Sequence, residues 1–151
     1  MANATAAMPP HAPARSSAST ATTVLDRLQP YVLSILRLMV GLLFLEHGMS
    51  RLFGFPSPLP TPPTLTMYWF AGCIEFTGGI LVILGLFTRP AAFIMSGEMA
   101  FAYFLSHAPR GFFPILNSGD PAVLYCFIFL YLAFAGAGPL SLDALLWRKR
   151  R

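Results

Sequence analysis

Four ionisable residues interrupt otherwise apolar stretches of this 151-residue chain: Arg37, Glu46, Glu75 and Glu98. An unpaired charge inside a lipid bilayer is costly and is a functional candidate by default. If these stretches cross a membrane, each charge therefore needs a partner or a proton. The chemistry that carboxylates and a guanidinium offer at such a depth is ion pairing and the holding or relay of a proton.

The depth of these charges follows from the helical rise of ~1.5 Å per residue. Arg37 lies roughly 10 Å from the start of its stretch, and Glu98 lies about 13 Å from the turn at Arg89. Glu75 enters from the opposite side to a similar depth. We therefore expect Arg37, Glu75 and Glu98 to form one buried polar cluster, in which one glutamate holds a proton. The alternative is a structural ion pair that only fixes helix register.

A second polar group lies nearer the other membrane surface and comprises Glu46, His47, Arg51 and His107. We interpret these residues as a candidate outer polar site. The alternative is an interfacial role, in which long side chains reach toward water while their stems stay in lipid. Arg89 occupies a three-residue connection before Pro90 and is interpreted as a structural turn residue.

The sequence contains no recognisable metal or nucleophile motif. It has no histidine pair at i, i+4, no glycine-rich phosphate loop and no nucleophile elbow. Cys73 and Cys126 form no CxxC pattern, which leaves two small core residues or, if their helices adjoin, a contact at similar depth. We therefore predict no metal site, leave catalytic residues unassigned and keep a quinone or haem site open.

Four apolar stretches hold the charged residues at depth, at residues 30–53, 66–87, 90–107 and 121–142. The chain is 56% hydrophobic and 11% charged, whereas a soluble domain carries about a quarter charged residues. A helix needs ~20 apolar residues to cross the hydrocarbon core, and these stretches lack the alternation of barrel strands. The sequence predicts an all-α membrane protein, a bundle of four transmembrane helices.

Small residues accompany the predicted cluster. Gly48 lies on the same helical stripe as Arg37, and Gly79 lies one turn from Glu75. Because small residues let membrane helices approach closely, we predict tight helix contacts along these two stripes.

The chain divides into three parts by composition. Residues 1–28 are rich in Ala, Ser, Thr and Pro and are predicted to be a disordered tail. They lack the apolar run of a secretory signal, and a transit peptide is the alternative. Residues 29–145 form the membrane domain, and residues 146–151 form a basic tail.

The placement of Lys and Arg predicts the orientation. Seven basic residues fall on one side of the predicted membrane, namely Arg15, Arg27, Arg89, Arg148, Lys149, Arg150 and Arg151. Two, Arg51 and Arg110, fall on the other. Positive residues concentrate on the cytoplasmic side, so both termini are expected there.

The order of motifs over residues 30–145 resembles the DoxX family. RLMVGLLFLEHGMSRLFGFP (residues 37–56) is similar to its first helix, and GCIEFTGGILVILGLFTRPAA (residues 72–92) to its second. EMAFAYFLSHAPRGFFPILNSGDPAVLY (residues 98–125) resembles its third helix and outer loop, and GPLSLD (residues 138–143) its end. Two mild departures are Ser118-Gly119-Asp120 in place of Gly-Gly-Glu, and Arg51 in place of Lys.

The resemblance implies a four-helix protein of the bacterial inner membrane. Some members are associated with quinone-linked oxidation of sulfur compounds, and others with membrane oxidoreductase complexes that handle thiol or peroxide stress. Arg37, His47, Glu75, Arg89 and His107 match the family's recurrent polar positions.

Three functions follow as hypotheses. The first is a redox-associated subunit, with a quinone as the possible cofactor. The alternatives are a non-enzymatic scaffold or assembly factor and, with less support, a small solute carrier. A bundle of this size rarely carries a whole catalytic cycle, so we expect the lipid bilayer and a membrane protein or a second copy as partners, and no nucleic acid.

Overall fold

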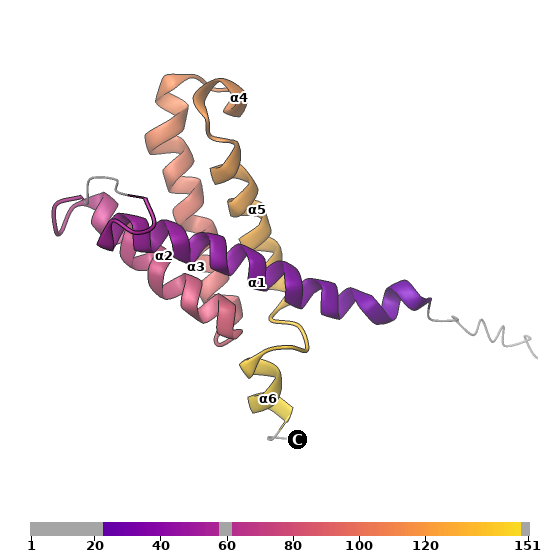
Figure 1. Cartoon of the computed structure of the whole chain (residues 1–151). Helices are drawn as coiled ribbons and strands as arrows, with labels where there is room; N and C mark the ends of the chain where they lie inside the picture. Colours follow the sequence, from indigo (N-terminus) through magenta and orange to yellow (C-terminus); the bar gives the residue numbers. More distant parts are fainter. Residues whose placement is uncertain (1–22, 58–61, 149–151) are drawn as a thin grey trace, which may run out of the picture.

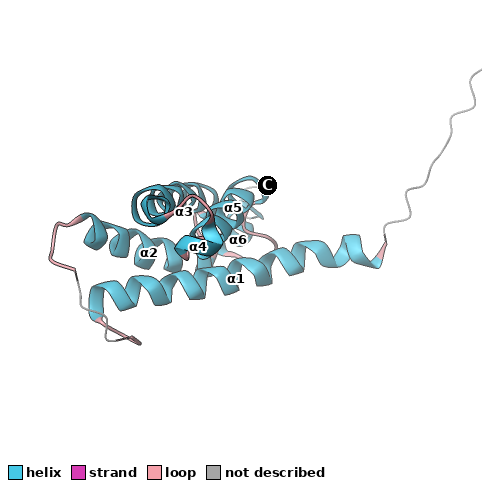
Figure 2. Ribbon diagram, turned by 90° about the horizontal axis from the view of Figure 1, so that it is seen from above, coloured by secondary structure: helices cyan, strands magenta, loops and turns pink. Residues whose placement is uncertain are grey.

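The computed structural model describes residues 23–57 and 62–148, and in these ranges it contains helices and loops but no strand. Figure 2 shows this all-helical architecture. The helices in chain order are α1 (Val24–Phe53), α2 (Met67–Leu84), α3 (Thr88–Ala102), the π-helix η1 (Tyr103–His107), the 3-10 helix η2 (Ala108–Arg110), α4 (Pro114–Asn117), α5 (Asp120–Ala135) and α6 (Leu142–Arg148).

Helix α1 begins six residues before the predicted start of the first apolar stretch. Thr23 and Asp26 form a reciprocal capping box, in which the Thr23 hydroxyl accepts the Asp26 N–H and the Asp26 carboxylate accepts the Thr23 N–H. This arrangement satisfies free donors of the first turn. Pro30 therefore lies inside the helix, and residues 24–28, which the sequence assigns to the tail, are helical. Residues 1–22 of that tail lie outside the described part.

The fourth predicted stretch, at residues 121–142, does not form one continuous helix. Helix α5 ends at Ala135, and Gly136 and Gly138 follow with φ values of 89° and 74°. Positive φ is accessible to glycine at little cost, so the chain turns here rather than continuing the helix. Residues 136–141 then form an irregular segment, which we call the C-terminal connector, before α6 begins.

The four main helices form two pairs. Helix α1 packs along α2, and α3 packs along α5, while α2 also contacts α3. Figure 1 shows that the two pairs cross each other rather than forming one parallel bundle. The shared core lies where they meet and contains Phe44, Val82, Met95 and Phe129, each at most 1% exposed.

Glycine makes the contact between α1 and α2 possible. A Cβ atom built on Gly48 would lie 2.4 Å from the Phe76 nitrogen, and one on Gly79 would lie 2.9 Å from the Leu45 Cα. The backbones are therefore too close for any side chain at these two positions. The prediction of tight contacts along the two small-residue stripes is confirmed.

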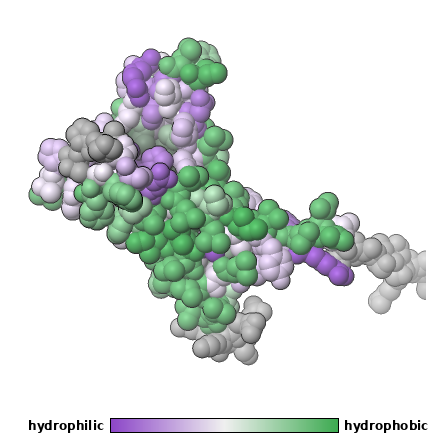
Figure 3. All heavy atoms as spheres, in the orientation of Figure 1, coloured by the Kyte–Doolittle hydropathy of each residue, from purple (hydrophilic) through white to green (hydrophobic). Residues whose placement is uncertain are grey.

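The exterior of the protein is largely apolar. Large hydrophobic side chains are exposed on all four main helices, and apolar residues cover much of the face that Figure 3 shows. Helices α1 and α2 are long and apolar enough to cross a membrane, and α5 is a shorter apolar helix. An apolar exterior of this extent is suited to contact with lipid rather than water.

Candidate functional site

Arg37 belongs to α1, and its side chain is buried against the end of α2, with 1% of its surface exposed. Its Nε donates to the Ala137 carbonyl at 2.9 Å, and its Nη2 donates to the Leu140 carbonyl at 2.6 Å. Its Nη1 donates to the carbonyls of Val82 and Ile83. The last carbonyls of a helix have no partner within the helix and carry its partial negative charge. Arg37 therefore joins the end of α2 to the C-terminal connector.

Arg37 forms no ion pair with Glu75 or Glu98 among the described residues, since all its side-chain bonds go to backbone carbonyls. Glu75 lies seven residues before Val82, which places it about 10 Å away along α2. The sequence-based depths were measured from helix starts and took no account of the reach of the arginine side chain. The side-chain nitrogen atoms of Arg37 are all bonded to carbonyls at the end of α2 and in the C-terminal connector. One of these carbonyls, that of Val82, also accepts the Gly85 N–H.

Glu75 instead pairs with Arg51. The Arg51 Nε lies 3.0 Å from the Glu75 Oε2, and only 1% of the Glu75 side chain is exposed. The close approach at Gly48 brings this part of α1 against α2, where a Cβ on Gly72 would lie 3.1 Å from the Arg51 Cβ. Within residues 23–57 and 62–148 this is the one ion pair.

Glu98 lies within electrostatic range of both members of this pair. Its Oε2 is buried, and no described residue forms a hydrogen bond with that atom. A buried carboxylate oxygen without a partner costs free energy unless it is protonated or meets a ligand. Glu98 therefore lies within electrostatic range of Glu75 and Arg51, and the ion pair of the region is formed by Arg51 rather than Arg37.

A cavity of about 630 Å³ lies beside these charges, and we call it the α2–α3 cavity. Its wall includes Arg51, Tyr68, Phe70, Glu98, Phe101 and His107. The Arg51 guanidinium carbon lies 5.9 Å from the centre of the Tyr68 ring. Gly97 also lines the cavity, and a Cβ built there would meet no atom within 4 Å. The wall thus combines aromatic surface with a guanidinium and a carboxylate, as small-molecule sites do.

The mouth of the α2–α3 cavity is shaped by the π-helix η1, which ends at His107. Single π-helical turns within helices are frequent at functional sites because they redirect side chains. The His107 Nδ1 lies 3.0 Å from the buried Asn117 carbonyl and 3.2 Å from Nη2 of Arg110. The Asn117 carbonyl can only accept and the Arg110 guanidinium can only donate, so Nδ1 can form a hydrogen bond with only one of them in a given tautomer.

The predicted outer polar site divides into two parts. Arg51 and His107 both line the α2–α3 cavity, whereas Glu46 and His47 do not. Glu46 and His47 are exposed on α1. The His47 Nδ1 lies 2.8 Å from the Leu43 carbonyl one turn earlier. Glu46 and His47 are adjacent on α1 and point in different directions, whereas His47 and Arg51 lie one turn apart on the same side of the helix.

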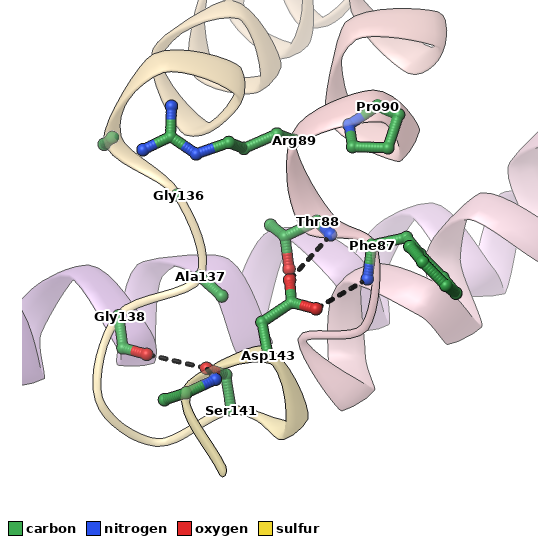
Figure 4. Close-up of a pocket in the computed structure, with 11 residues that line it drawn as sticks. Phe87, Thr88, Arg89, Pro90, Gly136, Ala137, Gly138, Ser141 and Asp143 are labelled. Atoms are coloured by element: carbon green, nitrogen blue, oxygen red, sulfur yellow. Dashed lines mark hydrogen bonds between the residues drawn. The ribbon is translucent and has the colours of Figure 1, made fainter. Parts of the chain in front are cut away.

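Sequence reasoning missed Asp143. Its two carboxylate oxygens accept the backbone N–H groups of Phe87 and Thr88 at 2.9 and 3.0 Å, and its own N–H donates to the Gly85 carbonyl at 2.9 Å. Figure 4 shows the carboxylate bonded to both amides. Asp143 thus caps α3 from a segment 55 residues away. The only sequence signal was its place in GPLSLD, which resembles a family motif.

Replacing Asp143 with alanine is expected to destabilise the protein by about 1 kcal/mol, and by no more than ~2, which is the usual cost of losing a helix cap. Thermal unfolding of the purified protein in mild detergent measures the change. Asp120→Ala is the matched control, because Asp120 is exposed at the start of α5. Equal effects of the two substitutions would contradict a capping role for Asp143.

Arg89 and the two cysteines lie outside the α2–α3 cavity. The Arg89 Nη1 donates to the Ala133 carbonyl near the end of α5 at 3.3 Å. Cys73 and Cys126 are both free, and the Cys126 sulfur lies 3.6 Å from the Ser96 hydroxyl. No group of three or more His, Cys, Asp or Glu residues able to hold a metal occurs in the described ranges.

Buried charges inside an all-helical fold with an apolar exterior define an integral membrane protein. A sequence model of the DoxX family matches residues 32–108, and the chain belongs to the DoxX family, as its motifs predicted. An uncharacterized protein of Haemophilus influenzae is 46% identical over 131 residues, covering 83% of this chain and 98% of that protein. Inner membrane protein YphA of Escherichia coli is 30% identical, covering 76% and 90%. No solved structure matches the chain significantly.

Proposed function

We propose that the chain crosses the bacterial inner membrane four times with both termini in the cytoplasm. Support comes from α3, whose 15 residues continue into the five of η1, and from the apolar α5, in addition to α1 and α2. The seven-to-two distribution of basic residues supports the orientation. The Escherichia coli relative is named as an inner membrane protein, which supports a location in that membrane. The α2–α3 cavity then lies toward the outer side.

Within this topology we propose a redox-associated subunit that binds a quinone in the α2–α3 cavity. The observation that carries the proposal is the buried Oε2 of Glu98, which has no hydrogen-bond partner among the described residues. Glu98 lies within electrostatic range of the Arg51–Glu75 pair and lines a cavity with aromatic rings in its wall. Tyr68 and Phe101 would stack on the quinone ring, and Arg51 would donate to a quinone oxygen. A bound quinone supplies the capacity to accept or release electrons and protons.

Access to the α2–α3 cavity suits a lipid-soluble ligand. Many residues of its wall are apolar and exposed on the outside of α2, α3 and η1, including Phe70, Ile94, Phe101 and Leu105. In the proposed topology this surface faces lipid, so a hydrophobic ligand would enter from the bilayer without crossing water. The charged groups lie behind the apolar surface and would orient the polar end of the ligand.

Filling the cavity from Gly97 tests this function. Gly97→Phe is expected to lower the affinity for a short-chain ubiquinone analogue at least tenfold, because the added ring occupies the open space beside Glu98. Isothermal titration with the purified protein in detergent measures the affinity. Gly97→Ala is the matched control, since one methyl group fits there and leaves most of the cavity free. Both variants should fold, because nothing lies within 4 Å of the new Cβ.

Unchanged quinone affinity in the Gly97→Phe variant, or no binding to the natural sequence, would reject the redox function. A scaffold or assembly factor would then be the better candidate. The observation that favours a scaffold is Arg37, whose bonds all go to backbone carbonyls and join α2 to the C-terminal connector. If the protein is a scaffold, Glu98→Gln should leave the redox activity of the membrane unchanged when the two variants are compared at equal protein abundance.

A further inference from the structure

A second cavity lies at the other end of the protein from the π-helix, and we call it the turn cavity. It has a volume of about 550 Å³ and is bounded by the turn between α2 and α3, the end of α5, the C-terminal connector and the start of α6 (Figure 4). Helix ends from both pairs meet here. In the proposed topology, on which this inference rests, that place is the cytoplasmic membrane interface.

One wall of the turn cavity carries Arg89. Its guanidinium extends toward Gly136, where a Cβ would lie 3.4 Å from Nη2. A guanidinium has five N–H donors, and only the Nη1 donation to the Ala133 carbonyl, at 3.3 Å, is made to a described residue. Most of the donors of Arg89 are therefore open to an anionic ligand.

A second wall carries the carboxylate of Asp143. Each of its oxygens accepts one backbone N–H at the start of α3, which leaves further lone pairs on both. Figure 4 places the Arg89 guanidinium and the Asp143 carboxylate on different sides of the cavity. They form no ion pair with each other, since the described ranges contain only the pair of Arg51 and Glu75.

The remaining wall of the turn cavity is mostly apolar and includes Phe87, Pro90, Ala135 and Ala137. A cavity with one separated positive group, one separated negative group and apolar surface between them matches a zwitterion with a hydrophobic body. A guanidinium is well suited to phosphate oxygens, and a carboxylate to an ammonium group. The carboxylate also disfavours a ligand that carries only negative charge.

We propose that the turn cavity binds the headgroup of a phospholipid of the cytoplasmic leaflet that carries a phosphate and a primary ammonium group, as phosphatidylethanolamine does. The phosphate lies on Arg89 and the ammonium on Asp143. The apolar wall receives the glycerol and the first carbons of the acyl chains. The bound lipid joins the turn between α2 and α3 to the C-terminal connector.

Native mass spectrometry of the full chain, released from detergent with defined lipids, tests this binding. We expect retention of phosphatidylethanolamine and at least tenfold weaker retention in Arg89→Gln. Arg27→Gln is the matched control, because Arg27 is an exposed basic residue predicted on the same side of the membrane. Equal retention by Arg89→Gln and the natural sequence would overturn the proposal.

Comparison of lipids tests the ammonium contact without altering the protein. Phosphatidylcholine has the same phosphate but a methylated ammonium that donates no hydrogen bond, so we expect several-fold weaker retention. Phosphatidylglycerol, which lacks the ammonium, should also bind more weakly. Equal or stronger binding of either lipid would overturn the zwitterionic assignment.

Two further measurements identify the source of any failure. Displacement of the lipid by inorganic phosphate or by glycerophosphoethanolamine at similar concentration would indicate a site for free phosphate compounds and reject the lipid.

Accessibility of a cysteine introduced at Arg27, labelled from either side of sealed vesicles, tests the topology on its own. Quinone affinity tests the α2–α3 cavity, so loss of lipid binding does not bear on the proposed redox function.

Discussion

Replacing Gly48 with alanine is expected to destabilise the protein by about 3 kcal/mol, one of the two largest effects that we predict. The new Cβ would lie 2.4 Å from the Phe76 nitrogen and 2.7 Å from its Cα, and both atoms belong to the α2 backbone. A backbone cannot rotate away as a side chain can, so α1 and α2 must separate. This separation also loosens the Arg51–Glu75 pair, which depends on the same close contact.

The direction of the change in stability at Gly48 is informative, because the higher helix propensity of alanine would by itself stabilise the variant. Alanine in a helix interior is favoured over glycine by ~1 kcal/mol, so a loss of stability at Gly48 must exceed that gain. Gly97→Ala is the matched control, where a Cβ meets nothing within 4 Å and we expect a gain of up to ~1 kcal/mol. Unfolding by titration with denaturing detergent measures both. A stabilised Gly48→Ala variant would show that the helices are not in backbone contact.

Replacing Arg37 with methionine is expected to destabilise the protein by about 3–5 kcal/mol, mainly because four buried or partly buried hydrogen bonds to backbone carbonyls are lost. A hydrogen bond from a charged group contributes roughly 1.5–3 kcal/mol, and a buried acceptor left without a donor costs about 1–3 kcal/mol. Methionine fills a similar volume, so the loss of stability measures the missing hydrogen bonds rather than the cost of a cavity. Arg37→Lys should recover only part of the stability, since an ammonium group cannot reach all four carbonyls. The same detergent titration measures both variants.

Double-mutant cycles determine which arginine interacts with Glu75. Arg51→Gln and Glu75→Gln should be coupled by about 0.5–3 kcal/mol, because the two side chains are in contact. Arg37→Gln and Glu75→Gln should add within ~0.5 kcal/mol, because they share no partner. Strong coupling between Arg37 and Glu75 would restore the cluster expected from the sequence and contradict the structure.

The helices were largely predictable because their signals are local. Apolar length located α1, α2 and most of α5, and the close glycine contacts of α1 with α2 followed from residue spacing. The end of α5 was placed too late, although Gly136 and Gly138, followed by Pro139, are a sequence signal for the end of a helix. Their positive φ values, and hence the turn, arise from the path that the C-terminal connector takes.

The candidate site was predicted in part. Glu98 lies within electrostatic range of Glu75, and the positive partner of Glu75 is Arg51, one of the residues assigned to the outer surface. Depth along the helix axis did not reveal these partners, because each arginine side chain reaches well beyond its own Cα: Arg37 extends to the end of α2, and Arg51 extends to Glu75. The α2–α3 cavity had no sequence signal, since it results from small residues such as Gly97 facing a gap between helices.

The sequence by itself determined that this is an all-helical membrane protein of the DoxX family with buried charges. Hydrophobic length, charge placement and motif order are properties of residues that are close in sequence, so each can be identified from the sequence alone. Only the tertiary structure decided the partners of those charges. Arg37 bonds to the end of α2 and to the C-terminal connector, and Asp143 caps α3 from 55 residues away. Such contacts depend on how helices cross and where the connector returns, and neither property is encoded in local spacing.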